Sequence, residues 1–252
     1  MRTALALFAA LALTAAGQAA DTRKSGFDYM QPATQALQKD DAQNPAMLWV
    51  KDGQSLWSQP DGKAAKSCAS CHGEITRMRG VAARYPTYSA AQKTVVNLGQ
   101  QINLCRVEQQ RATPWPAEHE SLLGIEAAIA KESRDQPIKP PAQPQLVAAQ
   151  KRGEALFNQR IGQLDLSCRD CHDKLAGKKL GGNTIPQGHA TGYPIYRLEW
   201  QSVGSLQRRL RGCMTAVRAE PYAFGASELV DLEAFLGKRS AGMRFEAPAV
   251  RP

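Results

Sequence analysis

Apolar residues recur at helical spacing along this 252-residue chain. Leu146, Ala149 and Gly153, followed by Leu156 and Phe157, fall at the three- and four-residue intervals that place one face of a helix against a core. The same spacing returns near the C-terminus, at Leu229, Leu232, Phe235 and Leu236. No segment shows the sustained alternation of apolar and polar residues that is typical of strands. The pattern therefore predicts a mainly α-helical protein.

The N-terminus carries a different apolar pattern. Residues 3–16 form an uncharged apolar stretch after Arg2, and the small residues Gly17 and Ala19 follow it. This order predicts a secretory signal peptide over residues 1–19, because the stretch is too short and wrongly flanked for a transmembrane helix. A buried N-terminal helix is the alternative. No other stretch is apolar and long enough to span a bilayer, so we expect an exported protein of the periplasm with no membrane segment.

Two five-residue motifs, Cys68–His72 and Cys168–His172, stand 100 residues apart. Both have the form Cys-x-x-Cys-His, in which two thiols bond covalently to the edge of one haem and the adjacent histidine ligates the iron. The sequence therefore predicts two covalently bound haem c groups. Their attachment residues are Cys68, Cys71, Cys168 and Cys171, and their iron ligands are His72 and His172.

The two halves of the chain repeat one order of features beyond these motifs. The recurring pairs are Gly53–Trp57 and Gly153–Phe157, Tyr85–Tyr88 and Tyr193–Tyr196, Cys105 and Cys213, and Leu122–Ala127 and Leu229–Ala234. Because the same features recur in the same order about 100 residues later, the sequence predicts two tandem copies of one domain. Each copy reads as helix, haem turn, loop, helix and closing helix, which is the pattern of a class I cytochrome c. We expect the glycine of each first helix to allow close approach of the last helix.

Composition shifts set the expected boundaries. Residues 20–44 are polar and patternless, and we treat them as an N-terminal arm. The first cytochrome c-like domain spans residues 45–136, and the second, with a C-terminal tail, spans residues 145–252. The proline-rich segment 137–144 between them predicts a stiff, extended linker.

The second protein ligand of each iron is a separate question. Cys105 and Cys213 are the one candidate pair that the repeat duplicates, since each lies 17 residues beyond its tyrosine box. Histidine–thiolate ligation of both irons is therefore the preferred interpretation. A Cys105–Cys213 disulfide and two buried thiols are the alternatives. The candidates that the repeat does not duplicate are Met78, Met214, His119 and His189.

The surroundings of Cys213 differ from those of Cys105. Four arginines accompany Cys213, at positions 208, 209, 211 and 218, and nothing comparable precedes Cys105. Arg209 is four residues before Cys213, on the same face of the expected helix. A guanidinium there would hold a small oxyanion beside the sulfur and favour the thiolate. A solvated basic helix face is the alternative.

The charge balance agrees with an anionic substrate or partner without proving one. The chain has 32 Lys and Arg against 23 Asp and Glu, a formal net charge of +9. A basic surface attracts acidic partners and small anions. No nucleic-acid-reading motif is present, and the expected compartment also excludes nucleic acid.

The combined pattern resembles SoxA, the family of dihaem subunits of the SoxAX cytochrome of bacterial sulfur oxidation. The resemblance covers essentially the mature chain. It rests on the two haem motifs, each with its later cysteine, and on the arginine-rich run that ends at Gly212, Cys213 and Met214. Some SoxA proteins lack the first haem, whereas this chain keeps both its motif and Cys105.

The resemblance implies an L-cysteine S-thiosulfotransferase, which joins thiosulfate oxidatively to a cysteine at the C-terminal end of the carrier SoxYZ. It places the active cysteine, often a persulfide, at Cys213 and the substrate-binding arginine at Arg209. It also implies a SoxX-like cytochrome c subunit as partner and a cytochrome c as electron acceptor.

Other functions remain open from the residues alone. A thiosulfate dehydrogenase would couple two thiosulfates to tetrathionate with a similar haem and basic pocket. A non-enzymatic electron-transfer cytochrome would need neither a reactive thiol nor an anion site, and a dihaem peroxidase is a weaker option. The sequence is equally compatible with a covalent adduct on Cys213 and with radical coupling at the haem edge.

Overall fold

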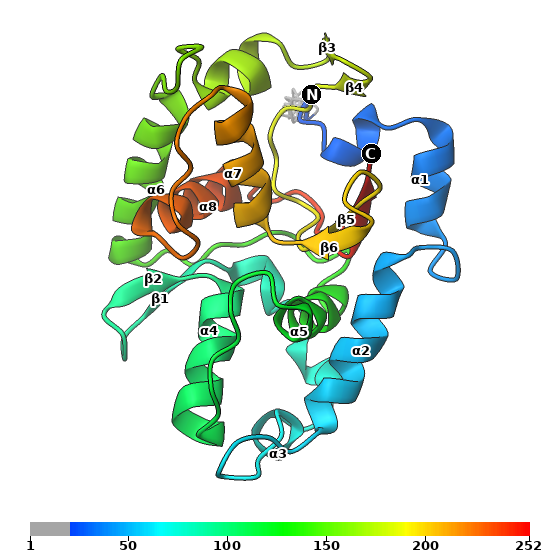
Figure 1. Ribbon diagram of the computed structural model, residues 1–252, viewed down its shortest axis with the longest axis vertical. Coiled ribbons are helices and arrows are strands. Elements are labelled where there is room, and N and C mark those ends of the chain that lie inside the picture. The colour runs from blue at the N-terminus through cyan, green and yellow to red at the C-terminus, as the bar shows by residue number, and fades with distance from the viewer. Residues whose placement is uncertain (1–20) are drawn as a thin grey trace, which may run out of the picture.

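The computed structural model describes residues 21–252, and the predicted signal peptide lies outside the described residues. Helices dominate the structure (Figure 1). They are α1 (Pro32–Lys39), α2 (Ala46–Ser58), α3 (Ala69–His72), α4 (Leu98–Cys105), α5 (Glu120–Lys131), α6 (Pro144–Asn158), α7 (Leu206–Ala216) and α8 (Ser227–Arg239). Short 3-10 turns are η1 (Gly26–Tyr29), η2 (Ile75–Met78) and η3 (Ala82–Arg84), and π-helical turns are η4 (Arg106–Gln110) and η5 (Asp170–Lys174).

Each half is built on the contact between its first and last helices, α2 with α5 and α6 with α8 (Figure 1). A Cβ atom at Gly53 would lie 1.9 Å from the carbonyl oxygen of Gly124, and one at Gly153 would lie 1.9 Å from that of Asp231. Glycine is required at both positions because any side chain would collide with the facing backbone. The prediction that these glycines allow close helix approach is confirmed.

An aromatic residue one turn after each glycine forms the centre of a core. Trp57 packs among buried residues that include Leu122 and Ile125 of α5. In the second half, the Phe157 ring lies 5.2 Å from that of Phe235 on α8. The two cores therefore use the same positions of the repeat with different aromatic side chains.

Short strands interrupt the helices, although the sequence pattern predicts none. They are β1 (Thr87–Ser89), β2 (Thr94–Val96), β3 (Lys179–Leu180), β4 (Asn183–Thr184), β5 (Ile195–Arg197), β6 (Ser202–Gly204) and β7 (Ala249–Arg251). The β1–β2, β3–β4 and β5–β6 pairs are antiparallel, and β7 adds to β5 in parallel. A strand of two or three residues is too short to show an alternating pattern.

The β1–β2 and β5–β6 hairpins have the same register in the two halves. Ser89 pairs with Thr94 in the first hairpin, and Arg197 pairs with Ser202 in the second. Each hairpin leads directly into the helix that carries the later cysteine, α4 or α7. Equivalent positions from the hairpin to the cysteine therefore differ by 108 residues.

Each hairpin packs on the helices of the opposite half. Val95 of β2 lies against Leu146 and Ala149 of α6. Tyr196 of β5 meets Trp49 of α2 edge to face, with ring centroids 5.9 Å apart. The two predicted domains therefore share packing contacts and are not joined through their linker alone.

The linker and the tail also cross between the halves. The backbone N–H of Ile138 donates to the carbonyl oxygen of Met243 at 2.9 Å, and Ile138 is buried. Phe245 and Ala247 belong to the first core, beside Trp57. Residues 137–144 are extended up to the start of α6 at Pro144, but they are packed into the protein rather than exposed as a spacer.

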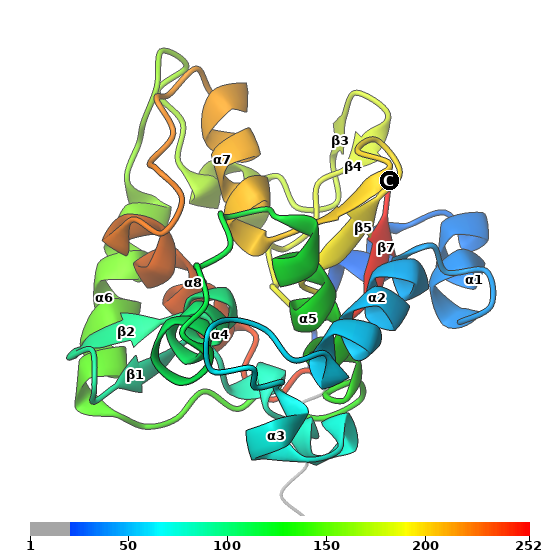
Figure 2. The same cartoon turned by 60° about the horizontal axis from the view of Figure 1, so that its bottom comes forward.

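The N-terminal arm contains ordered structure that its polar composition does not predict. It forms η1 and α1, and α1 lies beside β7 at the edge of the three-stranded sheet (Figure 2). The side-chain oxygen of Gln38 accepts a hydrogen bond from the backbone N–H of Val250 at 3.1 Å. Between residues 21 and 252, every helix is too short or too polar to cross a membrane.

Candidate haem and thiolate site

The second Cys-x-x-Cys-His motif is held by a network of short polar contacts. The Asp170 carboxylate accepts hydrogen bonds from the backbone N–H and the hydroxyl of Ser167, at 2.9 and 2.8 Å, and pairs with Lys174 at 2.7 Å. The Nδ1 atom of His172 lies 2.8 Å from the carbonyl oxygen of Pro186. Because a carbonyl can only accept, Nδ1 donates this bond, and Nε2 is the ring nitrogen available to Cys213 or to a metal.

Cys213 on α7 faces His172. Burial raises the pKa of the Cys213 thiol, but a hydrogen bond with His172 and the charges of Arg209, His172 and Arg197 outweigh burial and hold this pKa below its usual value. The thiolate is the form that ligates iron and attacks sulfur. The structure therefore brings together the predicted iron histidine, the predicted sulfur ligand and the predicted anion-binding arginine.

The arginines that follow one another along α7 point to different places. Arg208 lies over the Trp200 ring, 4.2 Å from its centroid, and Arg211 donates to a backbone carbonyl of the following loop. Arg218 is exposed beyond the end of the helix. Of the four arginines that the sequence groups here, Arg209 is the one whose charge lowers the pKa of the α7 thiol.

Arg197 is a further cation at this thiol, and the sequence pattern does not predict it. It lies on β5, 16 residues before Cys213, and is 6% exposed. Comparison of the two halves of the sequence could have found Arg197, because the residue directly after the tyrosine box is Ser89 in the first half and Arg197 in the second.

The first half places neutral groups where the second half places charge. Gln101 is one turn before Cys105, and its Nε2 atom donates to the Cys105 sulfur at 3.6 Å. Beside the haem motif, the Trp57 ring lies 5.8 Å from the ring of His72, and its indole N–H donates to the Gly73 carbonyl at 2.9 Å. The first site therefore contains the same ligand types, but a glutamine stands where the second half has Arg209.

Three of the four unduplicated candidates for iron ligation make other contacts, whereas His189 lines a pocket together with His172. His119 precedes α5 and accepts a hydrogen bond from the backbone N–H of Ser121 at 3.2 Å. Met78 and Met214 pack against the first and second cores. His189 is half-buried in a loop, and burial and the nearby charges of Arg239 and Arg23 lower its pKa to about 4.

The residues present fit a covalently attached haem in each half. All six cysteines are free, so no Cys105–Cys213 disulfide forms. The oriented His172 ring and the Cys213 sulfur that faces it would supply one nitrogen and one sulfur ligand to a haem iron. In the second half Cys168 and Cys171 would hold the haem. In the first half Cys68 and Cys71 would do so, and His72 and Cys105 would be the iron ligands.

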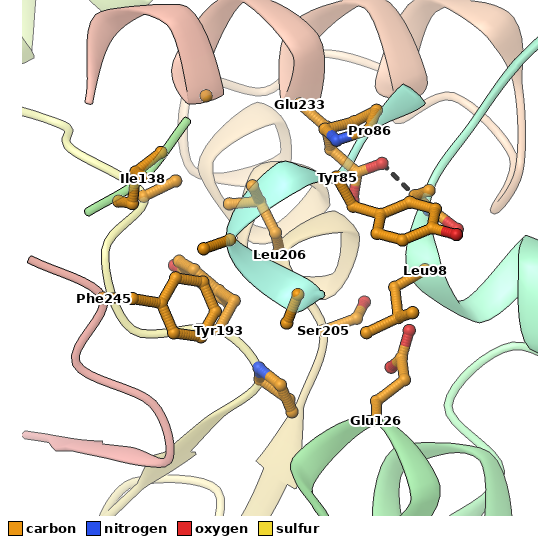
Figure 3. Close-up of a pocket in the computed structure, with 16 residues that line it drawn as sticks. Tyr85, Pro86, Leu98, Glu126, Ile138, Tyr193, Ser205, Leu206, Glu233 and Phe245 are labelled. Atoms are coloured by element: carbon orange, nitrogen blue, oxygen red, sulfur yellow. Dashed lines mark hydrogen bonds between the residues drawn. The ribbon is translucent and has the colours of Figure 1, made fainter. Parts of the chain in front are cut away.

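Residues of both halves line a cavity of about 110 Å³ (Figure 3). Glu126 of α5 and Glu233 of α8, which are equivalent in the repeat, both line it. Burial, followed by the charge of Glu233, raises the pKa of Glu126 to about 8. Burial raises that of Glu233 to about 7, although hydrogen bonds from Asn97 at 2.9 Å and Gln207 at 3.1 Å lower it.

Comparisons with known proteins agree with this geometry. The family described as SoxA/TsdA, cytochrome c domain, matches twice, over residues 52–138 and 152–245. The L-cysteine S-thiosulfotransferase subunit SoxA of Pseudaminobacter salicylatoxidans is 36% identical over 93% of this chain and 83% of its own length. The same subunit of Rhodovulum sulfidophilum is 33% identical over 92% of this chain and 81% of its own length. The crystal structure of SoxXA from P. pantotrophus matches with a TM-score of 0.88 and 28% identity, covering 91% of this chain and 87% of that chain.

The fold and the site thus define a cytochrome c with two copies of one domain, a class of protein that binds haem c covalently. The mainly α fold with two cytochrome c-like domains is confirmed. Within that class, the chain belongs to the SoxA family of thiosulfate-oxidising cytochrome subunits. Family membership favours this function over tetrathionate formation and over simple electron transfer.

Proposed function

We propose that this chain is the dihaem, periplasmic subunit of an L-cysteine S-thiosulfotransferase and that its reaction takes place at Cys213. The observation that carries the proposal is that the Cys213 thiol hydrogen-bonds with His172 and lies near enough to Arg209 for that charge to lower its pKa. A thiol that faces both an iron-binding histidine and a cation is suited to hold an anionic sulfur compound and to exchange sulfur.

The overall reaction joins thiosulfate to a carrier thiol. The carrier thiol loses its proton, a sulfur–sulfur bond forms to the outer sulfur of thiosulfate, and two electrons leave. When bound, each haem c accepts one electron at a time, so a cytochrome c acceptor is needed to remove the pair.

The side chains of the second half suggest two steps. Arg209 binds the sulfonate oxygens of thiosulfate through charge-assisted hydrogen bonds and directs the outer sulfur to the Cys213 thiolate. Loss of two electrons leaves a Cys213–S–SO₃⁻ adduct. The carrier thiolate then attacks the sulfur atom that is bonded to the Cys213 Sγ, takes the S–SO₃⁻ group and releases the Cys213 thiolate.

The partners follow from the same chemistry. The similar crystal structure is that of SoxXA from P. pantotrophus, and we propose that this chain likewise pairs with a SoxX-like cytochrome c. The carrier is a SoxYZ-like protein whose reactive cysteine lies on a flexible end that reaches the site. Two haems per chain fit the two equivalent ligand sets.

The proposal is tested with the purified holoprotein and its cytochrome partner, thiosulfate, a carrier with one terminal cysteine, and oxidised cytochrome c. Intact mass spectrometry should show the carrier gaining one S–SO₃⁻ group as two equivalents of cytochrome c are reduced. Without the carrier, tetrathionate should not accumulate. Tetrathionate formation at an equal rate without carrier would instead identify a thiosulfate dehydrogenase.

A further inference from the structure

Arg197 is a buried arginine on β5 whose charge helps to lower the pKa of the Cys213 thiol. Its Nε atom donates to the carbonyl oxygen of Pro252 at 2.9 Å, and its Nη2 atom pairs with Glu199 at 3.1 Å. Within residues 21–252, its Nη1 atom has no hydrogen-bond partner, and it is not sealed from solvent. One edge of the guanidinium is therefore anchored, and another nitrogen remains to bind a ligand.

The two halves of the chain provide an internal comparison for this residue. Arg197 occupies the position of Ser89, because both end the first strand of their hairpin and pair in the same register. Arg209 occupies the position of Gln101, one turn before the later cysteine. At both positions the first half has a neutral polar residue, so the second half has gained two cations around one thiol.

These cations lie close enough to affect one another. Arg197 and Arg208 both lie over the Trp200 ring, at 5.2 and 4.2 Å from its centroid, which places the β5 arginine beside the start of α7. Burial and then the charge of Arg209 lower the pKa of Arg197. A guanidinium group whose charged form is disfavoured by burial and a neighbouring cation is stabilised when an anion binds to it.

We infer that Arg197 is a second substrate-binding residue, and that with Arg209 it forms a two-arginine site for a doubly charged sulfur oxyanion beside the Cys213 sulfur. This inference rests on the proposed function and specifies the substrate class of that site. Two guanidinium groups donate charge-assisted hydrogen bonds to several oxygens of such an anion, which competes with the half-exposed Glu199 carboxylate for Arg197. A monoanion such as a sulfinate has fewer oxygens to accept these bonds and binds more weakly.

Sulfate, an unreactive dianion, tests the inference without turnover. Oxidised holoprotein is titrated with sulfate at constant ionic strength, and the absorption and EPR signals of the second haem are followed. In Arg197→Ser, which introduces the residue found at position 89, sulfate affinity should fall about tenfold or more, as expected for a lost charge-assisted contact. The thiosulfate KM should rise similarly with a smaller change in kcat.

Arg244→Gln is the matched control, because it removes one positive charge from a side chain that is 81% exposed and should leave sulfate binding unchanged. Sulfate binding in Arg197→Ser equal to the original protein, or no sulfate effect on the original protein, overturns the inference. If the serine variant fails to load haem, Arg197→Lys decides, since lysine cannot make paired bonds and must still bind sulfate more weakly. If carrier conjugation fails while sulfate binding depends on Arg197, the proposed function is wrong and the dianion site stands.

Discussion

Gln101 and Arg209 occupy equivalent positions of the two halves, each one helical turn before the cysteine that follows. The amide of Gln101 donates to the Cys105 sulfur, whereas the guanidinium of Arg209 brings a full positive charge to Cys213. One scaffold thus holds two sulfur atoms in different electrostatic surroundings. This difference is the reason that we propose substrate chemistry for the second half.

Replacing Arg209 should weaken substrate binding and leave the haem in place. Arg209→Gln introduces the amide of the first half and removes a charge-assisted contact worth about 1.5–3 kcal/mol. We expect kcat/KM for thiosulfate to fall by roughly 10- to 100-fold. Steady-state kinetics over a thiosulfate series measures the effect, and Gln101→Glu should leave the thiosulfate KM unchanged. Unaltered kinetics in Arg209→Gln would remove this arginine from the site.

Substitution of Cys105 and of Cys213 should have different effects on activity. Cys213→Ala removes the proposed nucleophile and should lower conjugation by at least about 10³-fold. Cys105→Ala should change the spectrum of the first haem and retain conjugation. Carrier mass spectrometry and haem absorption report both effects, and full conjugation in Cys213→Ala would exclude a covalent adduct at this sulfur.

The cavity between the halves should make stability depend on pH. The pKa of Glu126 is raised to about 8, above its unfolded value near 4.3. The folded state therefore binds this proton more tightly, so its stabilising contribution is present at acid pH and is lost as pH rises through about 8. As the pH rises from 5 to 8.5, the Tm of the original protein should therefore fall by ~5 °C more than the Tm of Glu126→Gln.

The exposed Glu120 lies on the same helix and supplies the control for that measurement. Glu120→Gln should follow the pH profile of the original protein, as monitored by far-ultraviolet circular dichroism during heating. Parallel profiles for Glu126→Gln and the original protein would show that the cavity carboxyl does not take up a proton on folding.

The helix contacts made by glycine should not tolerate a methyl group. Gly153→Ala places a Cβ atom 1.9 Å from the Asp231 carbonyl oxygen, which forces α6 and α8 apart. We expect a loss of at least about 1–3 kcal/mol in the free energy of unfolding by denaturant. Gly212→Ala, on α7 with nothing within 4 Å, should be neutral or slightly stabilising. Equal stability of the two variants would contradict the close approach.

The sequence predicts the parts of this protein that depend on local pattern. Helical spacing gives α6 and α8, and the motif spacing gives the haem turns. Arg209 is predictable because one turn of a helix fixes its place relative to Cys213. The strands are too short to show a periodic pattern. Each hairpin packs on helices of the opposite half, and no local pattern encodes that packing. Arg197 comes from another element, so its approach to Cys213 depends on the tertiary fold.

Low-temperature EPR of the oxidised holoprotein tests the central claim most directly, with haem content measured on the same sample. We predict two haem c groups per chain and low-spin histidine–thiolate signals from both. Cys213→Ala should remove one signal and Cys105→Ala the other. A methionine-type or bis-histidine spectrum for the haem on Cys168 and Cys171 would contradict the assignment of Cys213 as both iron ligand and reactive sulfur.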